Sequence, residues 1–105
     1  MKQAAMLATL WLAANAVVHG AEVEVGQKDM KFSRWRIVVK VGDTVSFKND
    51  DTVSHNIFSL SEAKTFDLGS YQPGQSRKVT FNKPGMVEVE CAVHPSMHMT
   101  VEVQK

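Results

Sequence analysis

Hydrophobic and polar residues alternate with a period of two along most of the chain after residue 21. The alternation is clearest in six runs, at residues 22–25, 37–41, 44–48, 79–81, 87–91 and 99–103. Gly, Pro, Asn and Asp gather between the runs, most densely at residues 49–51 and 82–85. This pattern predicts antiparallel strands that each turn one face toward a core.

No long stretch after residue 21 has the 3.6-residue period of an amphipathic helix, so the chain is expected to be all-β. Residues 59–75 are the least regular part, and we expect a long connection there. About seven or eight strands in one short domain predict a small β-sandwich.

The first 21 residues do not share this pattern. Lys2 precedes an apolar run at residues 4–18, and the small residues Gly20 and Ala21 follow. A positively charged N-terminus, a short apolar run and small residues at a possible cleavage site predict a secretory signal peptide. The run is shorter than the roughly 20 apolar residues of a membrane-spanning helix. We therefore expect a signal peptide at residues 1–21 and a periplasmic domain at 22–105 with no membrane span. An uncleaved N-terminal anchor is the alternative.

The exact cleavage point stays open on the sequence alone. Cleavage after Gly20 places Val18 three residues before the cut, whereas cleavage after Ala21 places His19 there, which is less usual.

Composition and charge narrow the class of protein. The chain has 105 residues, of which 44% are hydrophobic, and it has 12 Lys and Arg against 11 Asp and Glu. Those values fit one folded domain and exclude a large enzyme with a cleft between domains. Loss of Lys2 with the signal would balance the charges, so phosphate neutralisation on nucleic acid is not expected. We expect a monomer.

Cys91 is the single cysteine, which excludes an internal disulfide. Small exported domains commonly need a disulfide or a metal for stability, so a metal is the obvious substitute. Cys91 has the same parity as Val87 and Val89, so its thiol is expected to point inward at one rim of the sandwich.

A set of metal-binding side chains surrounds this cysteine. Cys91, His94 and Met97 follow one another at intervals of three, and His55 lies far upstream after a turn-rich segment. One thiolate and two imidazoles with a weak thioether form the trigonal site that suits both oxidation states of copper. Zinc is disfavoured because methionine does not usually complete its coordination.

The chain resembles the small cupredoxins, such as amicyanin, pseudoazurin and plastocyanin. The resemblance rests on His55-Asn56, Cys91-x2-His94 and Met97, together with residues 41–45, residues 79–81 and Pro84-Gly85, and it spans residues 22–105. It implies a cupredoxin-like Greek-key β-sandwich with one blue copper ion, which passes single electrons between exported redox partners. It also implies that Asn56 ties the two ligand segments together by hydrogen bonds. The short loop from Cys91 to Met97 is most similar to that of amicyanin.

Met99 and His98 compete with Met97 for a place at the metal. Met99 shares parity with Val101 and Val103, which favours a core role, so Met97 is the predicted axial ligand. Alternation turns His98 away from both methionines, toward solvent, although a third imidazole at the metal remains the alternative.

The segment before residue 37 contains Trp35 and a basic cluster of Lys31, Arg34 and Arg36. We expect Trp35 to plug the core at the entry of a strand. The cluster is expected to be a solvated face, which an acidic redox partner could use for steering.

Three functions compete. An electron carrier would exchange electrons through the solvent edge of His94, beside Pro95. A periplasmic protein for copper binding, tolerance or delivery would use the same site, and the Met97-His98-Met99 run favours it slightly. An enzyme with Cys91 as nucleophile and His94 as base lacks a Gly-rich oxyanion turn, so no enzyme is expected.

Overall fold

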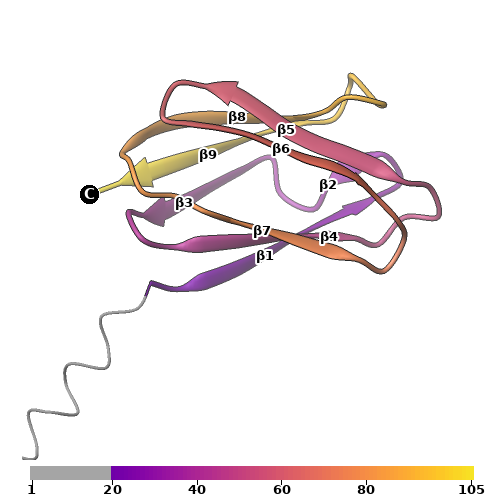
Figure 1. Ribbon diagram of the computed structural model, residues 1–105, viewed down its shortest axis with the longest axis horizontal. Coiled ribbons are helices and arrows are strands. Elements are labelled where there is room, and N and C mark those ends of the chain that lie inside the picture. Colours follow the sequence, from indigo (N-terminus) through magenta and orange to yellow (C-terminus); the bar gives the residue numbers. More distant parts are fainter. Residues whose placement is uncertain (1–19) are drawn as a thin grey trace, which may run out of the picture.

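The computed structural model describes residues 20–105, which form nine strands and no helix (Figure 1). Residues 1–19 of the predicted signal peptide lie outside the described residues. The strands are β1 (Glu22–Lys28), β2 (Lys31–Phe32), β3 (Arg36–Lys40), β4 (Thr44–Asn49), β5 (His55–Ser61), β6 (Lys64–Tyr71), β7 (Ser76–Thr80), β8 (Gly85–Cys91) and β9 (His98–Gln104). The all-β prediction is confirmed, with nine strands instead of seven or eight. Within the described residues, no helix is long and apolar enough to cross a membrane.

The strands form two sheets that face each other across one core. One sheet has the order β2-β1-β4-β7, and the other has the order β3-β9-β8-β5-β6. Figure 1 shows them as a lower and an upper layer. The alternating apolar residues of both inner faces are buried, among them Val25, Phe47, Phe81, Val87 and Val101, each with no exposed surface. The predicted sandwich is therefore confirmed.

The prediction that all strands pair antiparallel was wrong. β1 runs parallel to β4, with Glu22 opposite Thr44, and β3 runs parallel to β9, with Arg36 opposite Thr100. Period-two alternation reports which face of a strand is buried, but it carries no information about the direction of the neighbouring strand. The chain crosses repeatedly between the two sheets, and these crossings place the parallel strands together.

The expected long connection at residues 59–75 was also wrong. β5 and β6 form an antiparallel hairpin there, with Ser61 opposite Lys64. Phe58 and Leu60 look like core residues in the sequence, yet Ile57 and Ser59 are the fully buried ones and Leu60 is 76% exposed. This inverted parity, together with a register shift between Asn56 and Phe58, hides the strand from a simple hydrophobic pattern.

Trp35 does not plug the core. Its side chain is 79% exposed, in the segment between β2 and β3. Burial alternates from Ile37 onward, and Trp35 and Val38 both fall outside the buried set. Phe32 instead packs against the core, edge-on to Phe47 at a ring-centroid distance of 6.5 Å.

The topology brings two chain segments together at one end of the sandwich. β5 and β8 are antiparallel neighbours with Ile57 opposite Cys91, so β5 begins where β8 ends. The loop between β8 and β9 lies at the same end, opposite the C-terminus (Figure 1). The fold therefore gathers the predicted metal-binding residues in one place.

Candidate metal centre

Cys91 is the last residue of β8 and points into the sandwich. Its side chain is 2% exposed, and it forms no disulfide. The backbone N–H of Asn56 points at its Sγ atom at 3.5 Å, and the N–H of Ala92 donates to the carbonyl oxygen of Asn56 at 2.9 Å. These bonds fix the end of β8 against the start of β5. Asn56 thus ties the two segments together, as the resemblance implied, and it does so through its backbone.

The side chain of Asn56 serves the neighbouring strand. With its amide nitrogen turned toward β6, it donates to Asp67 Oδ1 at 2.9 Å and to the carbonyl oxygen of Gly69 at 3.3 Å. This contact holds the start of β5 in place. His55, the residue before Asn56, is held with it.

His55 opens β5 and is completely buried. The turn before it is organised by Asn49, which has no exposed surface. The amide nitrogen of Asn49 donates to the carbonyl oxygens of Val53 and Tyr71, and its oxygen accepts the N–H of Asp51. The turn therefore presents His55 in one orientation.

Asp51 fixes which nitrogen of His55 faces the cysteine. Its Oδ2 atom lies 2.9 Å from His55 Nε2 and also accepts the backbone N–H of Met30. That N–H and then the imidazole lower the pKa of Asp51 to about 2, so the carboxylate is ionised near neutral pH. An ionised carboxylate accepts the proton on Nε2 and leaves Nδ1 unprotonated, as a metal requires. The sequence analysis missed Asp51, although a carboxylate four residues before His55 was a visible signal.

His94 lies in the loop between β8 and β9 and is partly exposed. A tight turn closes behind it, in which the N–H of Met97 donates to the carbonyl oxygen of His94 at 2.9 Å. The neighbouring Val93 is 58% exposed and Pro95 is exposed. One side of the imidazole therefore faces the cysteine while the loop around it reaches the surface.

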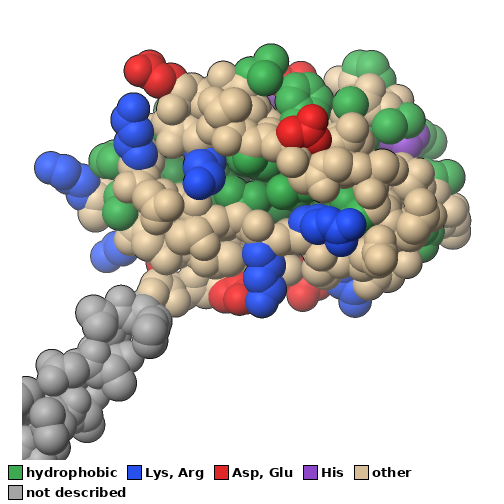
Figure 2. Space-filling model, in the orientation of Figure 1, with side chains coloured by type: hydrophobic (Ala, Val, Ile, Leu, Met, Phe, Trp, Pro, Cys, Tyr) green, Lys and Arg blue, Asp and Glu red, His purple; other side chains and the backbone are tan. Residues whose placement is uncertain are grey.

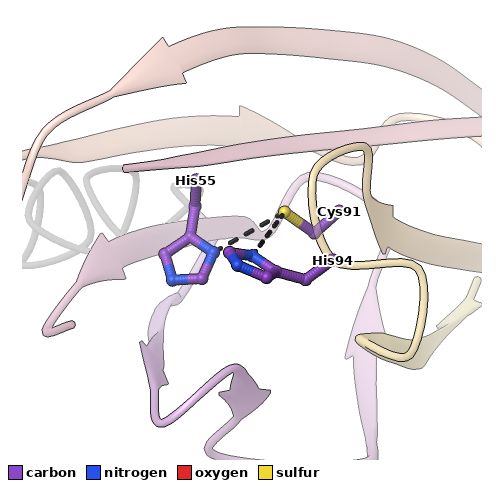
Figure 3. Close-up of side chains that lie close together, drawn as sticks. All are labelled: His55, Cys91 and His94. Carbon is purple, nitrogen blue, oxygen red and sulfur yellow. Dashed lines mark hydrogen bonds between the residues drawn. The ribbon is translucent and has the colours of Figure 1, made fainter. Parts of the chain in front are cut away.

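The three side chains converge on a single point (Figure 3). Cys91 Sγ lies 3.6 Å from His55 Nδ1 and 3.9 Å from His94 Nδ1, and the three ligand atoms lie within 4.8 Å of one another. Ligands about 2.1 Å from a common centre in a trigonal plane lie about 3.6 Å apart, so this spacing fits one ion among three donors. The donor chemistry, one thiolate and two imidazoles, fits copper.

The methionines and His98 lie as the alternation predicted. Met99 is fully buried within β9 and belongs to the core. Met97 is 1% exposed and lies in the loop three residues after His94. His98 is exposed and its Nε2 atom contacts a carboxylate oxygen of Glu88, so its imidazole is turned away from Cys91.

The chain matches the family model for copper-binding proteins of the plastocyanin/azurin family over residues 19–104. Two curated relatives come from Methylorubrum extorquens. Amicyanin-alpha is 30% identical over 96% of this chain and 92% of its own length. The methylamine utilization protein MauL is 31% identical over 61% of this chain, and the match spans only 57% of MauL.

Solved structures give the same fold. The amicyanin of Paracoccus versutus superposes with a TM-score of 0.72 and 28% identity, over 85% of this chain and 87% of that one. A copper-containing nitrite reductase from Thermus scotoductus has a TM-score of 0.75 and 24% identity over 80% of this chain. The chain spans only 22% of that enzyme, so this likeness concerns the fold alone.

Proposed function

Because this chain belongs to the plastocyanin/azurin family of copper-binding proteins, we propose that it is an exported carrier of single electrons and performs no substrate turnover. Copper is its cofactor, and when bound it supplies the Cu(I)/Cu(II) couple. The observation that supports the proposal most directly is the approach of two imidazole Nδ1 atoms to Cys91 Sγ at 3.6 and 3.9 Å.

The proposed ligands are His55, Cys91 and His94, with Met97 as the weak axial ligand. His55 and Cys91 are held by strands of one sheet, and His55 is further fixed by Asp51. Such a framework resists rearrangement when the charge of the ion changes. A small rearrangement lowers the barrier to electron transfer, so a rigid site suits a carrier.

His94 is the proposed route for electrons. It is the one residue of the three that is partly exposed, whereas His55 and Cys91 are buried. Figure 2 shows hydrophobic side chains beside a histidine on the surface at the end of the sandwich that holds the loop. A transient redox partner that contacts this surface would come within a few ångströms of the ligand set.

Substitution of the cysteine tests the proposal. The copper(II) form should show an intense visible thiolate-to-copper absorption band, and Cys91→Ser should abolish it because oxygen replaces the sulfur donor. The exposed His98 provides the control, since His98→Ala should leave the band unchanged. Absorption and EPR spectra of the copper-loaded proteins give the readout. A colourless copper(II) complex of the wild-type protein with its thiol intact would contradict the proposal.

Copper handling is the weaker alternative. Its sequence support was the run Met97-His98-Met99, which could capture copper as a cluster. In the fold, Met99 is a core residue and His98 pairs with Glu88 on the outside, so the three side chains do not act together. Metal transfer to an acceptor without redox change would favour this alternative.

Export to the periplasm also remains part of the proposal, although the signal that we propose ends at Gly20, one residue before the bound of the predicted signal at 1–21. Ala21 contributes to the folded domain: its N–H donates to Asp43 Oδ1 at 2.8 Å and its carbonyl oxygen accepts the N–H of Thr44. These bonds favour cleavage after Gly20 over cleavage after Ala21. A mass spectrum of the mature protein should show Ala21 as its first residue.

A further inference from the structure

An exposed aromatic ring lies next to the proposed copper site. Trp35 is 79% exposed in the segment between β2 and β3, although its backbone is held firmly by the N–H of Thr100, which donates to its carbonyl oxygen at 3.0 Å. An indole ring in water exposes a large apolar surface. Exposed tryptophans of this kind are enriched in protein–protein interfaces. No part of the proposed copper chemistry requires it.

Trp35 lines a groove that reaches the ligand loop. The groove has a volume of about 200 Å³. One wall comes from β2 and the residues beside it, and the other comes from Ser96, Met97 and His98 of the loop that follows His94. A molecule seated there would lie against the loop that holds the proposed axial ligand.

The charge of this groove has one sign. Lys31 and Arg34 line it, and no carboxylate does. Three Lys and Arg side chains of the described residues pair with carboxylates: Arg36 with Glu102, Lys48 with Asp50 and Lys78 with Glu22. Within residues 20–105, none of the ion pairs includes Lys31 or Arg34. Both charges therefore remain available to an outside partner in a chain that is otherwise nearly balanced.

We propose that this groove is the docking surface for a redox protein that presents carboxylates around an apolar contact, with Trp35 as the anchor and Lys31 and Arg34 as the steering charges. The inference rests on the proposed electron-carrier function and names the kind of partner. A second copy of this chain fits less well, because a two-fold contact through this face would bring like charges together.

Stopped-flow kinetics test the proposal. The partner is a c-type cytochrome that carries acidic residues on its outer surface around the exposed haem edge. One electron passes from the Cu(I) protein to the ferric haem, which becomes ferrous. Arg34→Glu should lower the bimolecular rate constant about three- to tenfold at low ionic strength, and the loss should shrink in 0.3 M salt. Trp35→Ala should lower the rate about fivefold at every ionic strength, since it removes an apolar anchor.

Lys83→Glu is the matched control. Lys83 is exposed in the turn between β7 and β8, at the end of β8 opposite Cys91, so its reversal should leave the rate within about twofold of the wild type. The visible spectrum and midpoint potential of each variant verify that the copper site is intact. Equal effects of Arg34→Glu and Lys83→Glu, or a wild-type rate in Trp35→Ala, would overturn the docking proposal.

Two further results separate this proposal from the one on which it rests. If the wild-type protein exchanges electrons with neither hexacyanoferrate(III) nor the cytochrome, the carrier function itself fails. If it exchanges with both and the variants match the wild type, only the docking surface is wrong. A dimer in sedimentation experiments that Trp35→Ala dissociates would assign the groove to self-association and overturn the proposal.

Discussion

At the scale of single residues, the site depends on how each donor is held. His55 is held on both sides, with Asp51 at Nε2 and Cys91 at Nδ1, whereas His94 faces the cysteine from a loop that reaches the surface. The same imidazole chemistry therefore occurs in two environments. The buried one is suited to fix the ion, and the exposed one is suited to pass the electron.

Asp51 is predicted to tune the metal through His55. An ionised carboxylate on the far nitrogen makes the imidazole a stronger donor, which stabilises Cu(II) more than Cu(I). Asp51→Asn should weaken Cu(II) binding by about 10- to 100-fold. A tenfold loss confined to Cu(II) raises the midpoint potential by about 59 mV. Voltammetry and copper titration measure both effects.

Asp50→Asn is the control for that prediction, because the neighbouring Asp50 is exposed and pairs with Lys48 instead of a histidine. A midpoint potential in Asp51→Asn that equals the potential of Asp50→Asn would show that the carboxylate does not act on the metal.

The two buried methionines should respond differently to truncation. Met97→Ala should change the EPR parameters and the potential while the protein stays folded, since it removes the proposed axial sulfur. Met99→Ala should lower stability by about 2–5 kcal/mol, as for a core residue, and leave the spectrum unchanged. Loss of the blue signature in Met99→Ala, but not in Met97→Ala, would reverse the axial assignment.

At the scale of elements, turns fix where the strands begin and end. The turn between β3 and β4 is closed by Asp43, whose carboxylate accepts the N–H groups of Lys40 and Ala21 at 2.8 Å each. The Lys40 N–H and then the Ala21 N–H lower the pKa of Asp43. A carboxylate with a depressed pKa in the folded state contributes stability above its unfolded pKa and loses it as the pH falls.

Asp43→Asn is therefore predicted to flatten the acid limb of the stability curve. The wild-type protein should lose stability as the pH falls below about 4, while the variant lacks this contribution. At neutral pH the variant should be less stable by about 1 kcal/mol, the value of hydrogen bonds near solvent. Urea unfolding between pH 2.5 and 7 gives the comparison, with the exposed Glu24→Gln as control. Parallel curves for wild type and Asp43→Asn would refute it.

The strand elements show where sequence patterns succeed. In β8, Val87, Val89 and Cys91 are all buried, as their parity predicted. In β5 the same rule fails, because the exposed Leu60 and the buried Ser59 exchange the places that their polarity indicates. Ser59 accepts the N–H of Ser61 with its hydroxyl, so a polar residue is satisfied inside. Local polarity alone cannot reveal such a compensation.

At the scale of the whole molecule, the metal and the fold are linked. Apart from Cys91 and Met97, the buried hydrophobic core consists of side chains outside the proposed ligand set, so the chain should fold without copper. A ligand that binds only the folded state adds about 4 kcal/mol of stability when its free concentration is 1,000 times Kd. Removal of copper by a chelator should therefore lower Tm by more than 10 °C. Calorimetry and far-UV circular dichroism of both forms test this, and unfolding of the metal-free protein at 25 °C would contradict it.

The sequence by itself determined the fold class, the inward parity of Cys91 and the chemistry of the donor set. These follow from local rules, since alternation reports strand faces and ligand softness selects the metal. The loop residues 91–97 are close in the chain, so their proximity needed no knowledge of the fold.

The tertiary structure alone decided what depends on contacts between distant segments. The antiparallel neighbours β5 and β8 bring His55 to within 3.6 Å of Cys91, and the turn held by Asn49 brings Asp51 to His55. The parallel pairing of β1 with β4 and the exposure of Trp35 likewise depend on contacts between distant segments. Each is set by which strands become neighbours, and the period of a single strand carries no information about its neighbours.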